Sequence, residues 1–144
     1  MSLISKLDQL VVYFNRRVLN VPDDLLNRNT QFLLNGVAYE TMLGRSPTDP
    51  LVRMITRGAA GYRFAATAVL HALESAHLLC GDFNVSAQHA SGTFVLSGVL
   101  RGTDNNFKEV VTVDLTLTDN DIVSVASVHL SEERLAQLRT ARSA

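Results

Sequence analysis

The second half of the chain contains four apolar-rich segments that alternate with turn-forming residues. These segments span residues 77–88, 93–102, 107–118 and 122–130, and the turns between them include Ser91-Gly92, Asp104-Asn105-Asn106 and Asp119-Asn120-Asp121. Apolar runs of this length, bounded by Gly, Asn, Asp and Ser, are typical of antiparallel strands. We therefore predict that the C-terminal half of the chain forms an antiparallel sheet.

Helical and hairpin signals dominate the first 42 residues. Apolar residues at helical spacing predict a helix over residues 2–19, and Pro22 with the two aspartates after it predicts a second, short helix. Asn35-Gly36 then separates two apolar runs, residues 31–34 and 37–42. Since a type I′ turn needs two residues that tolerate positive φ, this pair predicts a two-residue β-hairpin.

Two further helices are predicted around the sheet. Asp49 can cap a helical region over residues 50–74, which should break near Gly58 and Gly61 because each interior glycine costs about 1 kcal/mol relative to alanine. After the last strand, Ser131 can cap a final short helix, whose Leu135 and Leu138 should face inward. We find no internal repeat, linker or low-complexity tract, so we expect one domain over residues 1–144.

Composition and charge exclude several classes of function. The chain has 144 residues with 47% hydrophobic and 19% charged side chains, and its formal net charge is −1. Its 13 positive side chains are scattered, so it has no basic patch for nucleic acid. No apolar stretch approaches the ~20 residues that cross a bilayer, and no signal peptide is evident. We expect a cytoplasmic protein without nucleic-acid or membrane partners, with Cys80 as a small core residue.

The order of these elements resembles that of the nuclear-transport-factor-2-like superfamily, which includes SnoaL-like polyketide cyclases and ketosteroid isomerase. Arg57-Gly58-Ala59-Ala60-Gly61 is similar to the glycine-containing entry to the third helix in SnoaL-like proteins, and residues 109–118 and 122–130 resemble the closing hairpin. The resemblance implies an α+β fold in the order α-α-β-β-α-β-β-β-β, with N-terminal helices packed in a strongly curved antiparallel sheet. Such a cone implies a conical cavity for a ligand.

Ketosteroid isomerase provides a test of catalytic chemistry in this fold. That enzyme uses a carboxylate base near the first hairpin and an oxyanion hole of a tyrosine and a protonated carboxylic acid. By resemblance, Tyr13 and Asp114 are the candidates for the oxyanion pair. The base position falls at Leu34-Asn35, which carries no carboxylate, so that only Glu40 could substitute.

Strand alternation argues against a catalytic role for Asp114. Val111, Val113, Leu115 and Leu117 share one face of their strand, and Asp114 lies on the other with threonines. We predict that the aliphatic face is turned to the cavity and helices and that Asp114 points outward. The reversed register would line the cavity with Asp114 and threonines instead.

The candidate ligand-binding residues are aromatic or aliphatic, although aromatic residues in such positions are more often plain core. They are Tyr13, Phe32, Tyr39, Tyr62, Phe83, Val113 and Leu115. The four histidines show no compact zinc spacing, and no nucleotide-binding motif is present, so we expect neither a metal nor a cofactor.

Three functions agree with this pattern. The first is a small-molecule-binding protein with an apolar conical pocket and no complete catalytic set. The second is an isomerase, cyclase or dehydratase for a polyketide- or steroid-like substrate, and the third is a non-catalytic assembly module. In each case the open sheet has one face to cover, so we expect a homodimer. The size and polarity of the cavity distinguish the three.

Overall fold

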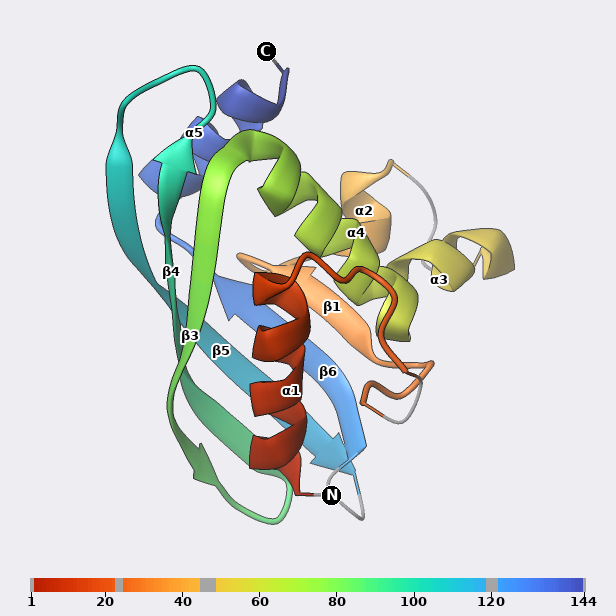
Figure 1. Cartoon of the computed structure of the whole chain (residues 1–144). Helices are drawn as coiled ribbons and strands as arrows, with labels where there is room; N and C mark the ends of the chain where they lie inside the picture. The colour runs from red at the N-terminus through yellow and green to blue at the C-terminus, as the bar shows by residue number, and fades with distance from the viewer. Residues whose placement is uncertain (1, 23–24, 45–48, 119–121, 144) are drawn as a thin grey trace.

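The computed structural model describes residues 2–22, 25–44, 49–118 and 122–143. Its elements follow the chain in this order: α1 (Leu3–Asn15), β1 (Gln31–Leu34), β2 (Val37–Ala38), α2 (Tyr39–Met42), α3 (Pro50–Thr56), α4 (Gly58–Ala72), β3 (Leu73–Val85), β4 (His89–Leu100), β5 (Asn106–Thr118), β6 (Ile122–His129) and α5 (Glu132–Ser143). The six strands form one curved sheet, with α1 and α4 on its concave side (Figure 1). The predicted α+β class is confirmed.

The strand order in the sheet is β2-β1-β6-β5-β4-β3. Strands β3 to β6 pair as consecutive antiparallel neighbours, as the spacing of the apolar segments predicts. The β1–β2 hairpin joins the other edge of β6, where β1 runs parallel to β6 and Phe32 lies beside Ala126. The first and last strands of the chain are therefore neighbours.

Several elements begin and end where local chemistry predicts. Asn35 and Gly36 have φ values of 49° and 84°, so the type I′ prediction for the hairpin turn is confirmed. The Asp49 side chain accepts from the backbone N–H of Leu51, and Ser131 accepts from that of Arg134, which satisfies free N–H groups at the starts of α3 and α5. The predicted helical break lies between Thr56 and Gly58.

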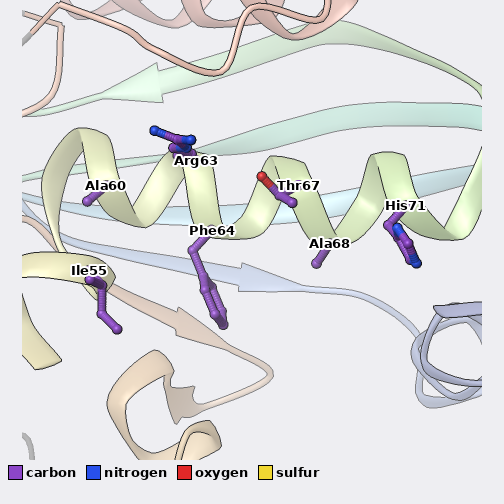
Figure 2. Close-up of a pocket in the computed structure, with 7 residues that line it drawn as sticks. All are labelled: Ile55, Ala60, Arg63, Phe64, Thr67, Ala68 and His71. Carbon is purple, nitrogen blue, oxygen red and sulfur yellow. The ribbon is translucent and has the colours of Figure 1, made fainter. Parts of the chain in front are cut away.

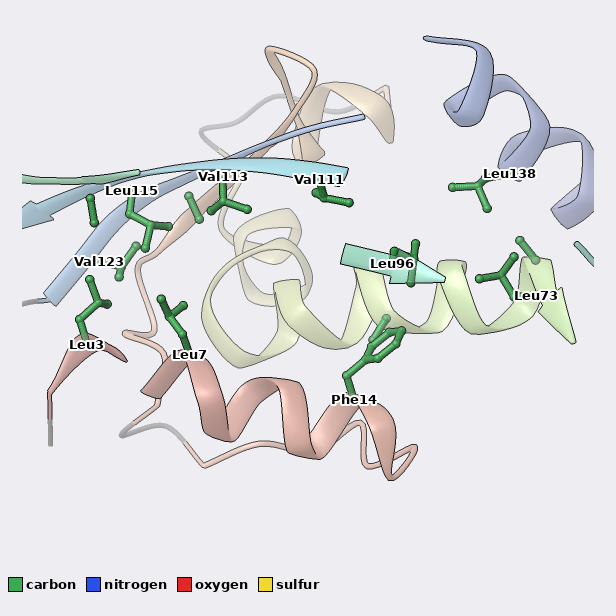
Figure 3. Close-up of a cluster of buried hydrophobic side chains, with 14 of the residues drawn as sticks. Leu3, Leu7, Phe14, Leu73, Leu96, Val111, Val113, Leu115, Val123 and Leu138 are labelled. Atoms are coloured by element: carbon green, nitrogen blue, oxygen red, sulfur yellow. The ribbon is translucent and has the colours of Figure 1, made fainter. Parts of the chain in front are cut away.

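The concave side of the sheet is filled by side chains (Figure 3). Leu3, Leu7 and Phe14 of α1 pack in one cluster with the aliphatic face of β5. Val113 and Leu115 are each only 3% exposed, whereas the threonines between the β5 aliphatics are exposed. The predicted parity of β5 is confirmed, and Asp114 lies on the convex face.

Three local predictions are wrong. Residues 37–42 do not continue as a strand, because β2 ends at Ala38 and Tyr39–Met42 form α2. The short helix predicted after Pro22 is absent from the described residues: Leu25 donates to the Pro22 carbonyl in a turn, while residues 23–24 lie outside the description. Ser91-Gly92 is not a turn but part of β4.

The errors at α2 and at Ser91-Gly92 have physical causes. Tyr39 and Glu40 are buried by contacts with residues distant in sequence, and this burial overrides strand alternation in α2. Gly92 is needed for packing, since a Cβ there would lie 2.5 Å from the Phe83 ring. The predicted turn at residues 119–121 lies outside the described residues.

Candidate functional site

A surface hollow lies along one side of α4, beside the end of α3. It has a volume of about 580 Å³ and is lined by Ile55, Ala60, Arg63, Phe64, Thr67, Ala68 and His71. Apart from Ile55, these residues recur at helical spacing, so they form one continuous stripe on α4. Figure 2 shows Ile55, Phe64 and His71 extending to the same side of the helix.

An aromatic row begins at Phe64 in the hollow and continues into the buried core. The ring centroids of Phe64 and Tyr39 are 5.4 Å apart, and Tyr39 stacks on Phe32 at the same distance with an interplanar angle of 16°. Burial raises the pKa of Tyr39 to about 12, so its hydroxyl is neutral at physiological pH. The row thus links the hollow to β1 through apolar contacts.

Glu40 is the one candidate acid or base that lies near the hollow. Its side chain is fully buried, and Oε1 accepts from Arg57 Nε at 3.0 Å and from Thr56 Oγ1 at 3.2 Å. The other oxygen, Oε2, is buried without a hydrogen-bond partner among the described residues. This carboxylate joins α2 to the junction between α3 and α4.

The pKa of Glu40 decides what it can do chemically. Burial alone would raise it, but hydrogen bonds from its own backbone N–H, from Arg57 and from Thr56, together with the Arg57 charge, hold the pKa below its usual range. A general base that works near neutral pH needs a pKa close to that pH. Glu40 is therefore a weak base with a structural ion pair.

The three candidate catalytic residues are not brought together. Tyr13 packs beside a small cluster of Val21, Leu25 and Leu26 at the end of α1, whereas Glu40 contacts Thr56 and Arg57. Asp114 lies on the convex face of β5, opposite Ser91 and Ser127 of the neighbouring strands. Their contacts have no residue in common.

The predicted pocket residues separate into several places. Phe32 and Tyr39 belong to the aromatic row, while Phe83 pairs with Phe94 at a centroid distance of 5.6 Å. Tyr62 donates to the Val18 carbonyl, and burial raises the pKa of its hydroxyl to about 12. None of the seven residues predicted for the pocket lines the α4 hollow.

Sequence reasoning missed the residues that do line the hollow. The signal was present as Ala60, Phe64 and Ala68 at i, i+4 and i+8, a second apolar stripe beside the residues Tyr62, Ala66 and Val69 that pack in the core. Phe64 was the most informative of them. A large aromatic side chain outside the face of a helix that packs in the core indicates a second apolar contact surface.

The remaining reactive groups do not form a site of their own. Burial, reinforced by the charges of Asp8 and Asp82, raises the pKa of the Cys80 thiol, which disfavours a nucleophilic thiolate. No group of three His, Cys, Asp or Glu side chains within the described ranges could hold a metal ion. No described helix is long and apolar enough to span a membrane.

Comparison with known proteins identifies the fold. No protein-family model and no curated protein matches the chain. Solved structures do match. A protein from Catenulispora acidiphila with a ketosteroid isomerase-like fold, in complex with trimethylamine, superposes with a TM-score of 0.66 at 12% identity over 93% of this chain and 92% of that one.

Two other neighbours match equally well. An NTF2-like protein of unknown function from Burkholderia pseudomallei gives a TM-score of 0.65 at 13% identity, covering 96% of this chain and 98% of its own. A SnoaL-like polyketide cyclase from Agrobacterium tumefaciens gives 0.65 at 9% identity, covering 95% and 97%.

Proposed function

We propose that this protein binds a small apolar molecule without transforming it and that the binding site is the α4 hollow. The chain has the NTF2-like fold, and its structural neighbours are NTF2-like, ketosteroid isomerase-like and SnoaL-like proteins. The observation that carries the proposal is the hollow itself. Its volume of about 580 Å³ falls within the range of small-molecule sites, and Ile55, Phe64 and Ala68 give it apolar walls.

The proposed site lies outside the cone rather than among the β5 aliphatics. Val113 and Leu115 are occupied by contacts with α1, whereas the α4 hollow is open to solvent. Arg63, Thr67 and His71 lie among its apolar residues. Such polar groups can orient a bound molecule, while the apolar walls supply most of the binding free energy.

The surroundings of the two candidate carboxylates, Glu40 and Asp114, support binding without catalysis. Glu40 is held as an ion pair by Arg57, and Asp114 is on the far face of the sheet from α1. Among the structural neighbours, one is in complex with trimethylamine and others are polyketide cyclases, so small molecules are the ligand class common to these folds.

A thermal-shift screen of apolar metabolites tests the proposal. A ligand that binds only the native state stabilises it by about 2.7 kcal/mol at a hundredfold excess over its dissociation constant. Ala68→Phe should fill the hollow and abolish the shift. Ala136→Phe, at an exposed position on α5, is the matched control and should leave the shift unchanged.

Two results would contradict this function. Equal loss of binding in both variants would place the ligand elsewhere. Measurable double-bond isomerisation of a 3-keto steroid, abolished by Tyr13→Phe or Asp114→Ala, would show that the protein is an enzyme.

Self-association is a second candidate function, and the convex face of the sheet favours it. Leu79, Val95 and Val110 are direct neighbours across β3, β4 and β5. Leu79 is 51% and Val110 is 59% exposed, so this row presents apolar surface that a second copy could cover. The proposed partner is another copy of the same chain.

A further inference from the structure

A second hollow lies at the end of the convex face nearest the β4–β5 turn. Its volume is about 520 Å³, and it is lined by Arg17, Ser75, Ala76, His77, Leu79, Ser97, Gly98, Asn106, Phe107 and Lys108. Three of these side chains can carry a positive charge, and three others are hydroxyls or an amide. None of the described residues that line it is acidic.

The sheet register fixes two of the cationic side chains on either side of a hydroxyl. His77 of β3 lies opposite Ser97 of β4, which in turn lies opposite Lys108 of β5. Adjacent strands are about 4.8 Å apart, so His77 and Lys108 originate about 10 Å from each other. Neither the Arg57–Glu40 ion pair nor the Arg134–Glu109 ion pair involves this group.

Arg17 occupies a backbone position that normally belongs to glycine. At the end of α1, the Val18 N–H bonds to the Tyr13 carbonyl and the Arg17 N–H bonds to the Phe14 carbonyl. This pair of bonds is the Schellman motif, whose left-handed residue is usually glycine. Arg17 takes that position with φ of 62°, so the chain keeps an arginine where glycine would fit without strain.

The cost of the left-handed backbone at this position indicates that the Arg17 side chain has a role that glycine could not supply. Arg17 lines the same hollow as His77 and Lys108. We infer that this hollow binds a small molecule that carries a phosphate group. Arg17 and Lys108 would neutralise the phosphate, with Ser75, Ser97 and Asn106 as neutral donors.

The ligand class follows from the shape and chemistry of the hollow. A guanidinium binds phosphate through two parallel hydrogen bonds, and an ammonium adds a mobile point charge. The hollow is larger than one phosphate, and the exposed Leu79 side chain adds an apolar wall. A phosphomonoester with an apolar group therefore fits better than inorganic phosphate. This site is separate from the α4 hollow and does not depend on its function.

An NMR titration of the full chain tests the inference, with inorganic phosphate and phenyl phosphate as probes in low-salt buffer. We expect saturable shifts of the Ser97 and Lys108 amides, with phenyl phosphate binding at about 1 mM or tighter. Arg17→Gly should weaken binding about tenfold, because a charged hydrogen-bond donor is lost. Its melting temperature should stay the same or rise, because glycine accepts the left-handed backbone.

Arg16→Gln is the matched control, since it removes the neighbouring positive charge, which does not line the hollow. Unchanged binding in this variant supports a specific site. Equal weakening in both variants, shifts that do not saturate, or a lower melting temperature for Arg17→Gly would overturn the inference. Binding to phosphatidic acid vesicles without binding to phenyl phosphate would also overturn it, in favour of a lipid headgroup.

Discussion

At the level of single residues, the Glu40–Arg57 ion pair determines how α2 attaches to the rest of the molecule. The Glu40 side chain is fully buried, and the Arg57 side chain is 18% exposed. Removing one partner of such a pair leaves the other charge without compensation, which is far more destabilising than loss of an exposed pair. The pair therefore acts mainly in stability.

We predict that Glu40→Gln lowers the free energy of unfolding by about 3 kcal/mol at pH 7. The folded-state pKa of Glu40 lies below its unfolded value. Its contribution is thus fully present above the unfolded value and is lost as the pH falls through the folded pKa. Urea unfolding between pH 7 and pH 3 measures both effects.

Glu133→Gln serves as the control, because Glu133 is an exposed carboxylate on α5. It should change the unfolding free energy by about 0.5 kcal/mol or less. If both variants show the same stability and the same pH dependence, the ion pair does not stabilise the fold.

Sequence reasoning selected Glu40 as a possible acid or base but could not find its role. The sequence pattern over residues 37–42 predicts that Glu40 lies on a strand. Its partner Arg57 lies 17 residues later in the sequence, after α2 and α3. Only the tertiary structure brings them together. In contrast, the orientation of Asp114 could be predicted, because four aliphatic neighbours on one face need burial.

At the level of elements, the signals that predicted correctly were local. The Asn35-Gly36 turn, the Asp49 and Ser131 caps and the break before Gly58 each depend on residues within one turn of the chain. The α2 helix and the true start of β4 depend on distant packing, so local patterns predicted neither. Local patterns could not predict the complete α4 hollow either, because it forms only where α3 packs beside α4.

The hairpin turn offers a direct test of local chemistry. A Cβ on Gly36 would meet no atom within 4 Å, so any cost of substitution there comes from its φ of 84°. We predict that Gly36→Val destabilises the fold by about 1–3 kcal/mol. Gly36→Asn should cost clearly less, because asparagine tolerates positive φ. Equal losses in urea unfolding would mean that the backbone conformation is not the cause.

At the level of the whole molecule, the convex face is the surface that remains without an intramolecular partner. Thr116 is exposed on this face, opposite His89 of β4 and Val125 of β6. It lies eight residues from Lys108, or about 26 Å along β5. A dimer centred near Thr116 therefore lies at the opposite end of β5 from Lys108, whereas one that also covers the Leu79–Val95–Val110 row would cover Leu79 in the second hollow.

If the protein dimerises through this face, Thr116→Arg should convert the dimer to a monomer, because like charges would meet near the two-fold axis. Its far-UV spectrum should not change. Light scattering at micromolar concentration measures the mass. Thr140→Arg, at an exposed position on α5, should remain dimeric. A monomeric wild-type protein would refute the proposed dimer.

The pairing of β1 with β6 has a consequence for the order of folding. Leu34 aligns with Val128, so the hairpin at residues 31–38 has no sheet to join until the last strand has been synthesised. On the ribosome, the three strands β3 to β5 can pair in sequence, while the earlier hairpin has no partner strand and the Phe32 side chain stays exposed to solvent. Since such late, long-range closure is slow, the nascent chain is most vulnerable to aggregation just before β6 emerges.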